Sequence, residues 1–280
     1  MADLARFAPR LRPARPDLAA DHLRGQVAAE RFVAGKACRV TASLLDLTAR
    51  PERGAELATQ LLYGETFTVY EMRPDGLAWG QAALDGYVGY VDARGLGPPQ
   101  CRGQRVTALA SHLYAEPNAK APPSRELPFL AEVAVAGTTG GFARLRGGGC
   151  VPRPHLEPLS GDFVSQAERF LGVPYRWGGR SARGIDCSGL VQLSLLAVGR
   201  PAPRDSDMQA AVIGSTLDGD APPERGDLVF WKGHVGIMRD AATLLHANAW
   251  HMAVAAEPLA EAARRTAALG GGPILVRRRP

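Results

Sequence analysis

The spacing of apolar residues along the chain changes near Leu159. Before this point, short β-branched and aromatic runs alternate with turn residues, as in Thr66-Phe-Thr-Val-Tyr-Glu and Gly86-Tyr-Val-Gly-Tyr-Val. Runs of this length between turn residues predict short strands. After this point, apolar residues recur first at helical spacing and then in short strand-like runs. The pattern therefore predicts β-rich domains followed by a mixed α+β domain.

The β-rich part divides into two stretches of similar length, 37–99 and 100–159. The second repeats the pattern of the first and begins with Arg105-Val-Thr-Ala-Leu. Two tandem barrels of about 60 residues each fit this spacing of strands and turns. Residues 1–36 are rich in Arg, Pro and Ala, and we expect them to form a leader with one short helix around Pro16 to Glu30.

Residues 160–280 are expected to form the α+β domain. Ser160 should cap a first helix, which Gly172 ends and in which four apolar residues recur at i, i+4, i+7 and i+8: Phe163, Ala167, Phe170 and Leu171. A second helix is expected to begin at Cys187 or Ser188 and continue to Gly199; it is apolar nearly all round and should be buried. Four strand-like runs follow, at 227–231, 234–238, 243–247 and 273–276.

Composition excludes several classes of protein. The 280 residues exceed the ~100–200 of a single domain, and 46% apolar residues suffice for real cores. The 32 Gly and 22 Pro favour turns and short strands over a helical bundle. The net charge of +5 comes mainly from arginines spread along the chain, whose longest run is Arg277-Arg278-Arg279. We therefore expect no nucleic-acid partner.

Cysteine usage and the N-terminal residues bear on the compartment. The early arginines are not followed by an apolar stretch of ~7–15 residues, so no secretory signal and no membrane span are predicted. Four cysteines are dispersed without Cys-x-x-Cys spacing, which argues against a zinc cluster or a disulfide framework: Cys38, Cys101, Cys150 and Cys187. We expect a cytoplasmic protein with no membrane partner, metal or cofactor. A monomer is compatible with the sequence.

Cys187 is the candidate nucleophile. It follows a glycine-rich loop and opens the apolar helix. A thiol at a helix N-terminus feels the positive end of the macrodipole and nearby unpaired N–H groups, and both favour the thiolate. The same N–H groups can hold the oxyanion of a tetrahedral intermediate. The other three cysteines are expected to be inert.

A nucleophilic thiol needs a base, and the base needs a group that orients it. If 239–241 forms a three-residue loop, His234 lies directly across from His246 and both rings point to one face of the sheet. A loop of two or four residues would place them on opposite faces. Asn248 is a second candidate for the orienting group, and His251 is expected in a loop.

Several motifs of the last 120 residues resemble the NlpC-type cell-wall cysteine peptidases in sequence and in order. They span about 160–276 and are Pro174-Tyr-Arg-Trp-Gly-Gly, Gly184-Ile-Asp-Cys-Ser-Gly-Leu-Val, Pro203-Arg-Asp-Ser, Arg225-Gly-Asp-Leu-Val-Phe-Trp, His234-Val-Gly-Ile and Leu245-His-Ala-Asn. The resemblance implies a papain-like fold and hydrolysis of peptide bonds in peptidoglycan stem peptides. It implies Cys187 as nucleophile, His234 as base and His246 as the third, orienting residue.

The two upstream barrels resemble bacterial SH3-like domains. Family members with two such barrels and no signal peptide are similar to cytoplasmic enzymes of muropeptide recycling. These cut the γ-D-glutamyl bond to the diamino acid of stem peptides that begin with a free L-Ala. The resemblance implies that the first barrel walls off the cleft and reads the free amine.

Candidate substrate contacts follow from this picture. A free ammonium needs an acidic partner, for which Glu65 in the first barrel and Asp186 beside the nucleophile are candidates; Glu65 as an ordinary solvated carboxylate is the alternative. Tyr87 or Tyr90 would close the cleft as an aromatic wall. Further residues match the family's contacts near the oxyanion and the substrate: Tyr175, Ser188 and Ser206.

Other conspicuous residues have structural interpretations. Asp205 is a candidate N-cap for a helix through Met208. Arg204 and Asp227 are expected to pair and hold the loop beneath the site. Two tryptophans are expected in the core: Trp177 and Trp231.

The expected function is a cytoplasmic cysteine endopeptidase that acts on short muropeptides. One alternative is a binding protein in which the barrels recognise cell-wall peptide and the third domain is degenerate. A second alternative is an amidase or acyltransferase, because Cys-His sites serve any acyl transfer. Export for wall remodelling would need a route that the sequence does not display.

Overall fold

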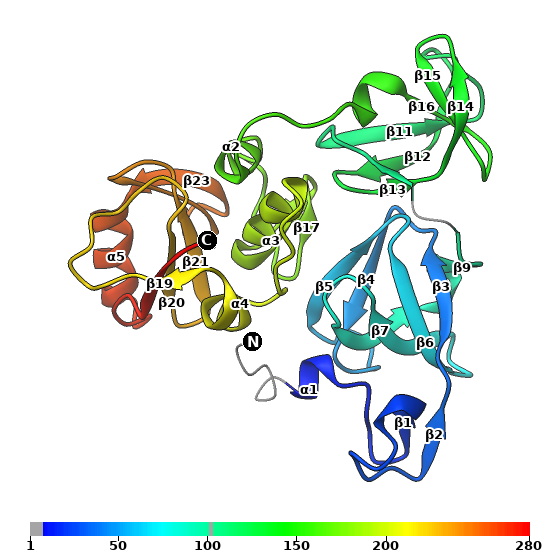
Figure 1. Ribbon diagram of the computed structural model, residues 1–280, viewed down its shortest axis with the longest axis horizontal. Coiled ribbons are helices and arrows are strands. Elements are labelled where there is room, and N and C mark those ends of the chain that lie inside the picture. Colours follow the sequence, from blue (N-terminus) through cyan, green and yellow to red (C-terminus); the bar gives the residue numbers. More distant parts are fainter. Residues whose placement is uncertain (1–7, 101–102) are drawn as a thin grey trace. The chain divides into compact units, whose positions relative to one another are not determined.

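The computed structural model describes residues 8–100 and 103–280, so Cys101 lies outside the described residues. Figure 1 shows the elements in chain order. The chain forms two compact units, of which the first extends to Pro158 and the second begins at Leu159. None of the helices in the described ranges is long and apolar enough to cross a membrane.

The leading segment of the first unit is not the helix that the sequence predicted over 16–30. It contains a short helix α1 (Ala8–Leu11), strand β1 (Leu18–Ala20), a 3-10 turn (Asp21–Leu23) and strand β2 (Arg31–Val33), which pairs in parallel with β1. All three residues of β1 are buried, and Leu18 packs with Trp79, Val88 and Tyr90. Because burial against the first sheet requires an extended chain here, tertiary packing overrides the local helix propensity.

The first sheet contains seven antiparallel strands in the order β5-β4-β8-β7-β6-β3-β9. The strands are β3 (Lys36–Val40), β4 (Leu44–Thr48), β5 (Leu57–Leu62), β6 (Thr66–Met72), β7 (Leu77–Ala82), β8 (Val88–Asp92) and β9 (Leu96–Gly97), with a 3-10 turn at Ala93–Gly95. Gly80 and Gly89 lie opposite each other on β7 and β8. A Cβ on Gly80 would lie 2.1 Å from the Thr68 carbonyl oxygen, so only glycine permits this close approach.

The second sheet has the order β12-β11-β16-β15-β14, with a separate ladder between β10 and β13. Its strands are β10 (Gln104–Arg105), β11 (Ala110–Tyr114), β12 (Pro123–Pro128), β13 (Glu132–Val133), β14 (Val135–Thr139), β15 (Phe142–Leu145) and β16 (Cys150–Pro152), followed by a 3-10 turn (Arg153–Leu156). Tyr63 packs into the core of this sheet with Val106 and Leu127. Tyr63, which directly follows β5 of the first sheet, therefore packs in the core of the second sheet. The prediction that the two larger sheets form two separate barrels stays a prediction.

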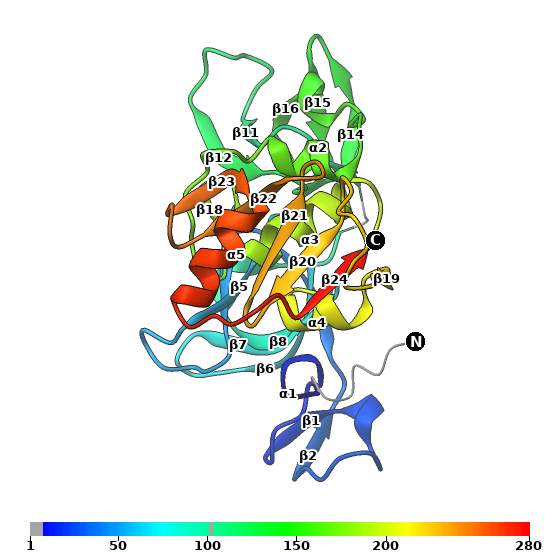
Figure 2. The same ribbon diagram turned by 90° about the vertical axis from the view of Figure 1, so that its left-hand side faces the viewer.

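The second unit has the α+β composition that the sequence predicted. Its six-stranded sheet has the order β19-β24-β20-β21-β22-β23, and Figure 2 shows these strands side by side. The strands are β19 (Ser215–Thr216), β20 (Leu228–Trp231), β21 (His234–Met238), β22 (Thr243–Asn248), β23 (Ala253–Pro258) and β24 (Val276–Arg279); β17 (Arg180–Ser181) and β18 (Gly184–Ile185) form a separate ladder. The last strand was predicted at 273–276, and β24 begins three residues later, at Val276. Strand β23 was not predicted.

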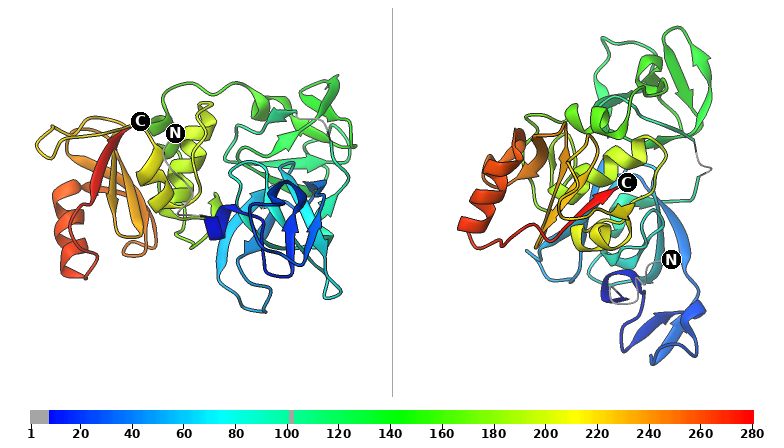
Figure 3. Two further views of the ribbon diagram at one scale, coloured as in Figure 1. Left: turned by 60° about the horizontal axis from the view of Figure 1, so that its bottom comes forward. Right: turned by 60° about the vertical axis from the view of Figure 1, so that its left-hand side comes forward.

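The helices of the second unit are α2 (Phe163–Glu168), α3 (Cys187–Ala197), α4 (Ser206–Val212) and α5 (Leu259–Ala268). Helices α3 and α5 cover opposite faces of the sheet (Figures 1 and 3). The expected cap of α2 is wrong, because Asp162 rather than Ser160 accepts the N–H of Ser165, at 2.8 Å. Helix α3 begins at Cys187 as predicted and is buried along almost its whole length, which fixes the position of its first turn.

Candidate active site

The first turn of α3 places Cys187. Asp186 is its N-cap, and one carboxylate oxygen accepts the N–H of Gly189 at 2.7 Å. The other oxygen accepts the N–H of Gly178 at 2.9 Å, which folds the glycine-rich loop onto the helix. A Cβ on Gly189 would lie 2.6 Å from the carbonyl oxygen of Gly179, so glycine is needed where the loop meets the helix. These contacts fix the backbone that carries the thiol.

Asp186 is also half of a buried ion pair. Arg204 donates to its two carboxylate oxygens at 3.0 and 2.6 Å and to the Ser188 hydroxyl at 2.9 Å. The side chain of Arg204 is 1% exposed. The expected pairing of Arg204 with Asp227 is wrong, because Asp227 pairs with Arg279. The buried cap carboxylate needs a compensating charge, and Arg204 supplies it.

The surroundings of Cys187 act against the predicted effect of the helix N-terminus and favour the neutral thiol. Its side chain is buried, and burial raises the pKa of Cys187 to about 12, with the charge of Asp186 adding to the rise. Hydrogen bonds from the backbone N–H groups of Val235 and Ser188, and the charge of Arg204, act in the opposite direction and lower that pKa by less. The thiol therefore needs a base, and its contact with Val235 places the sulfur at the start of β21, where His234 lies.

The two histidines meet through one hydrogen bond. The Nε2 atom of His234 lies 2.8 Å from Nδ1 of His246, and the ring centroids are 5.1 Å apart. The strand register differs from the expected one by two residues, since Met238 pairs with Leu244. This two-residue difference keeps both rings on the same face, because side chains alternate with period two.

The side chain of Asp240 accounts for this register. Its carboxylate accepts the N–H groups of Ala242 and Thr243 at 2.9 and 2.8 Å. The N–H of Arg239 donates to the Thr243 carbonyl at 2.8 Å, so the loop spans 240–242 instead of 239–241. An Asx-type turn of this kind favours the later loop position.

Both imidazoles are neutral at pH 7. Burial, to which the neighbouring His246 adds, lowers the pKa of His234 to about 3. Burial also lowers the pKa of His246, although Glu257 acts against this. A neutral His234 has one unprotonated ring nitrogen, which is what a general base requires.

Two residues behind the histidines were not predicted from the sequence: Glu257 on β23 and Arg265 on α5. An oxygen of Glu257 lies 2.8 Å from Nε2 of His246, and Arg265 donates to both carboxylate oxygens, to Oε2 at 2.7 Å. Burial alone would raise the pKa of Glu257, but these hydrogen bonds outweigh it and lower the pKa to about 2. The sequence offered one indication of Glu257, which is the single acidic residue in the otherwise apolar run Ala253-Val-Ala-Ala-Glu.

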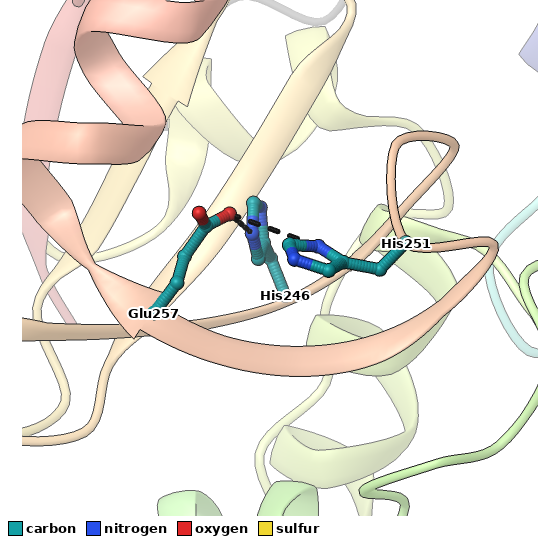
Figure 4. A group of neighbouring side chains, drawn as sticks. All are labelled: His246, His251 and Glu257. Carbon is teal, nitrogen blue, oxygen red and sulfur yellow. Dashed lines mark hydrogen bonds and ion pairs between the residues drawn. The ribbon is translucent and has the colours of Figure 1, made fainter.

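His246, His251 and Glu257 each offer one donor atom, and these atoms lie within 4.8 Å of one another (Figure 4). The Nδ1 of His251 lies 3.9 Å from Glu257 and 3.0 Å from the side-chain oxygen of Asn248. The side-chain oxygen of Asn248 therefore contacts His251, and its amide nitrogen donates to the His246 carbonyl at 3.4 Å. Arg265 donates to both oxygens of Glu257, so these side chains take part in a hydrogen-bond network.

Of the remaining candidates in the second unit, Tyr175 and Ser188 lie at the first turn of α3. Tyr175 is half-buried; burial raises its pKa, and the nearby charges of Cys187 and Asp186 add to the rise. Ser188 is buried against Arg204, and Ser206 is the first residue of α4, which Asp205 precedes without a side-chain cap bond. The two tryptophans differ: Trp231 is buried as expected, but Trp177 is 56% exposed.

Two candidates belong to the first unit. Glu65 is 7% exposed and its carboxylate accepts the N–H of Leu62 at 3.0 Å, so it is not a solvated surface carboxylate. Tyr87 is 5% exposed and lines a cavity of about 140 Å³ together with Trp79 and Tyr90. Their contact with substrate stays a prediction.

Comparisons with known proteins agree with the sequence resemblance. Residues 172–270 match the NlpC/P60 family, and 47–96 match the bacterial dipeptidyl-peptidase SH3 domain. Dipeptidyl-peptidase 6 of Lysinibacillus sphaericus is 26% identical over 241 residues, 75% of this chain and 86% of that protein. The gamma-D-glutamyl-L-lysine dipeptidyl-peptidase of Bacillus subtilis is 32% identical over 139 residues, 43% of this chain and 46% of that protein.

Two solved structures share the fold. An NlpC/P60 family protein from Bacillus cereus has a TM-score of 0.69 at 19% identity, over 87% of this chain and 99% of that one. An NlpC/P60 endopeptidase from Photobacterium damselae has a TM-score of 0.60 at 14% identity, over 86% and 70% of the two chains. This chain thus carries a bacterial SH3 domain and an NlpC/P60 domain, the domain of a family of cysteine peptidases.

Proposed function

We propose that this chain, an SH3 domain joined to an NlpC/P60 domain, is a cysteine endopeptidase of peptidoglycan stem peptides. It hydrolyses the γ-D-glutamyl bond to a diamino acid in peptides that begin with a free L-Ala. The observation that carries the proposal is the position of the Cys187 sulfur, which accepts the N–H of Val235 next to His234, whose ring in turn contacts His246. The name of the Bacillus subtilis relative supports the choice of bond.

The reaction starts from a neutral thiol and a neutral imidazole. As Sγ of Cys187 attacks the γ-carbonyl carbon, His234 takes the thiol proton. Backbone N–H groups at the start of α3 stabilise the oxyanion. His234 then gives its proton to the leaving amine, and a thioester remains on Cys187. Water, deprotonated by His234, attacks the thioester and releases the γ-carboxyl group and the thiol.

Specificity in this proposal comes from acceptors for the substrate's ammonium group. Glu65 and Asp186 are the proposed carboxylates, Tyr87 the aromatic wall, and Tyr175, Ser188 and Ser206 the polar contacts. Arg204 donates to both oxygens of Asp186 and so fixes the orientation of this carboxylate. We also propose that the enzyme acts in the cytoplasm on released stem peptides that begin with a free L-Ala.

The test uses the purified full chain and three peptides. L-Ala-γ-D-Glu-L-Lys should be cleaved to L-Ala-D-Glu and Lys, whereas its N-acetylated form and the α-linked isomer should not. Chromatography with mass detection follows the products. Cys187→Ala should abolish cleavage. Equal cleavage of the acetylated peptide would contradict the amine specificity, and absence of cleavage of the free peptide would contradict the function.

A further inference from the structure

We propose that Glu257, held by Arg265, is a positioning residue that sets the tautomers of both histidines and thereby makes Nδ1 of His234 the basic nitrogen. The catalytic consequence rests on the proposed function, but the tautomers do not. Four side chains from β21, β22, β23 and α5 form the chain of hydrogen bonds His234, His246, Glu257 and Arg265. One of these four groups cannot lose a proton, and this determines which group donates and which accepts in each hydrogen bond of the chain.

That group is the guanidinium of Arg265. It donates to both carboxylate oxygens of Glu257, and a guanidinium has donors but no acceptor. The side chain of Glu257 is 9% exposed, and Arg265 and His246 keep its pKa at about 2 despite burial. Glu257 is therefore ionised at neutral pH and can only accept hydrogen bonds.

The proton positions on the two rings follow. Because Oε1 of Glu257 only accepts, Nε2 of His246, at 2.8 Å, must carry a proton. A neutral His246 then has a bare Nδ1, which accepts from Nε2 of His234 at 2.8 Å. A neutral His234 with its proton on Nε2 has its lone pair on Nδ1. This is the nitrogen left to receive the thiol proton.

The same chain stabilises the intermediate. When His234 has taken the thiol proton it is an imidazolium, and its Nε2–H still donates to His246. The negative charge of Glu257 lies one imidazole further along. His251, whose Nδ1 is 3.9 Å from Glu257, is the other titratable group facing this carboxylate. Its ring is held by Asn248, so it borders the chain without forming part of it.

The tautomers can be measured without substrate. In the full chain labelled with ¹⁵N-histidine, long-range ¹H–¹⁵N correlations at pH 7 should show both His234 and His246 protonated on Nε2. Variants His234→Gln and His246→Gln assign the signals. A wild-type His234 protonated on Nδ1 would overturn the proposal, whatever any variant does.

A variant then tests the role of the carboxylate. In Glu257→Gln an NH₂ group, which only donates, replaces one of the two carboxylate oxygens that accept hydrogen bonds. The tautomer populations of both histidines should therefore change. We expect kcat to fall on the order of 10²-fold, with KM changed by less than about 3-fold. The loss should be smaller than the ~10⁴-fold seen when the direct partner of a catalytic histidine imposes the wrong tautomer, because Glu257 acts on His234 through His246. Glu257→Asp, which keeps the charge, should restore the wild-type tautomers and part of kcat.

Glu168→Gln is the matched control. Glu168 is a carboxylate of the same unit that accepts from two arginines, Arg239 at 2.7 Å and Arg225 at 3.4 Å, outside this chain of hydrogen bonds. The substitution Glu168→Gln should leave the tautomers of both histidines and kcat unchanged. Unchanged tautomers and kcat in Glu257→Gln would overturn the proposal. Expected tautomers in a protein that cleaves no stem peptide would uphold it and contradict only the proposed function.

Discussion

Arg204 donates two hydrogen bonds to the carboxylate of Asp186, the residue directly before the candidate nucleophile. Both side chains are buried, at 1% and 9% exposure. One ion pair therefore supports the cap of α3, the Ser188 hydroxyl and the position of the thiol. It also joins the loop before α4 to the first turn of α3, two segments that the sequence separates by a whole helix.

Removing Arg204 should destabilise the second unit strongly. Arg204→Met leaves the carboxylate of Asp186 buried without its partner, which costs about 3–5 kcal/mol of the free energy of unfolding. Urea denaturation followed by circular dichroism measures this. Arg225→Met removes an arginine from the exposed pair with Asp162 and should cost at most about 1 kcal/mol. Equal losses in the two variants would contradict the structural role of the buried pair.

The thiol of Cys187 should alkylate slowly at neutral pH. Since burial raises its pKa to about 12, the rate with iodoacetamide should rise steadily to pH 10 without a plateau. Peptide mapping by mass spectrometry isolates the site from Cys38 and Cys150, which are also free. A plateau below pH 8.5 would show a resting thiolate and contradict the neutral thiol. Slow alkylation is thus no sign of a degenerate site.

Acid should destabilise the protein through His234. Its pKa is about 3 in the folded state and near 6.5 when unfolded, so between these values the unfolded chain binds the extra proton. The free energy of unfolding should therefore fall as the pH drops from about 6.5 to about 3. Between pH 7 and 4.5, wild type should lose about 1–3 kcal/mol more than His234→Gln. Identical losses in urea titrations at these two pH values would exclude the effect.

A methyl group at Gly189 should disturb the active site. Gly189→Ala places a Cβ 2.6 Å from the Gly179 carbonyl oxygen, so the loop must move away from the first turn of α3. We expect a loss of about 1–3 kcal/mol and a fall in kcat. Ser194→Ala on the same helix removes a buried hydroxyl that has no hydrogen-bond partner among the described residues, so it should not destabilise the protein. Wild-type kcat in Gly189→Ala would show that the close approach is dispensable.

The sequence predicted elements whose signal is local. Helix α3 is apolar nearly all round and begins at its N-cap, so its start at Cys187 could be predicted. That His234 on β21 and His246 on β22 point to the same face of the sheet was also predictable, because side chains alternate along strands. The exact register was not, since it depends on hydrogen bonds that the loop backbone donates to the Asp240 carboxylate.

The missed residues depend on tertiary contacts. Glu257 lies on a strand whose alanine-rich run gave no clear period, and Arg265 reaches it from the next helix. The helix predicted over 16–30 failed because packing on Trp79 and Val88 selects an extended chain. The burial that raises the pKa of Cys187 could not be predicted either, because no local pattern reports how deeply a side chain is buried.

Trapping of the acyl-enzyme tests directly whether Cys187 is the nucleophile. The full chain is mixed with excess L-Ala-γ-D-Glu-L-Lys, quenched with acid within milliseconds to seconds, digested and mapped by mass spectrometry. We predict an L-Ala-γ-D-Glu group in thioester linkage on the peptide that contains Cys187, absent from Cys187→Ala and strongly reduced in His234→Gln. Hydrolysis of the peptide by Cys187→Ala at the wild-type rate would contradict it.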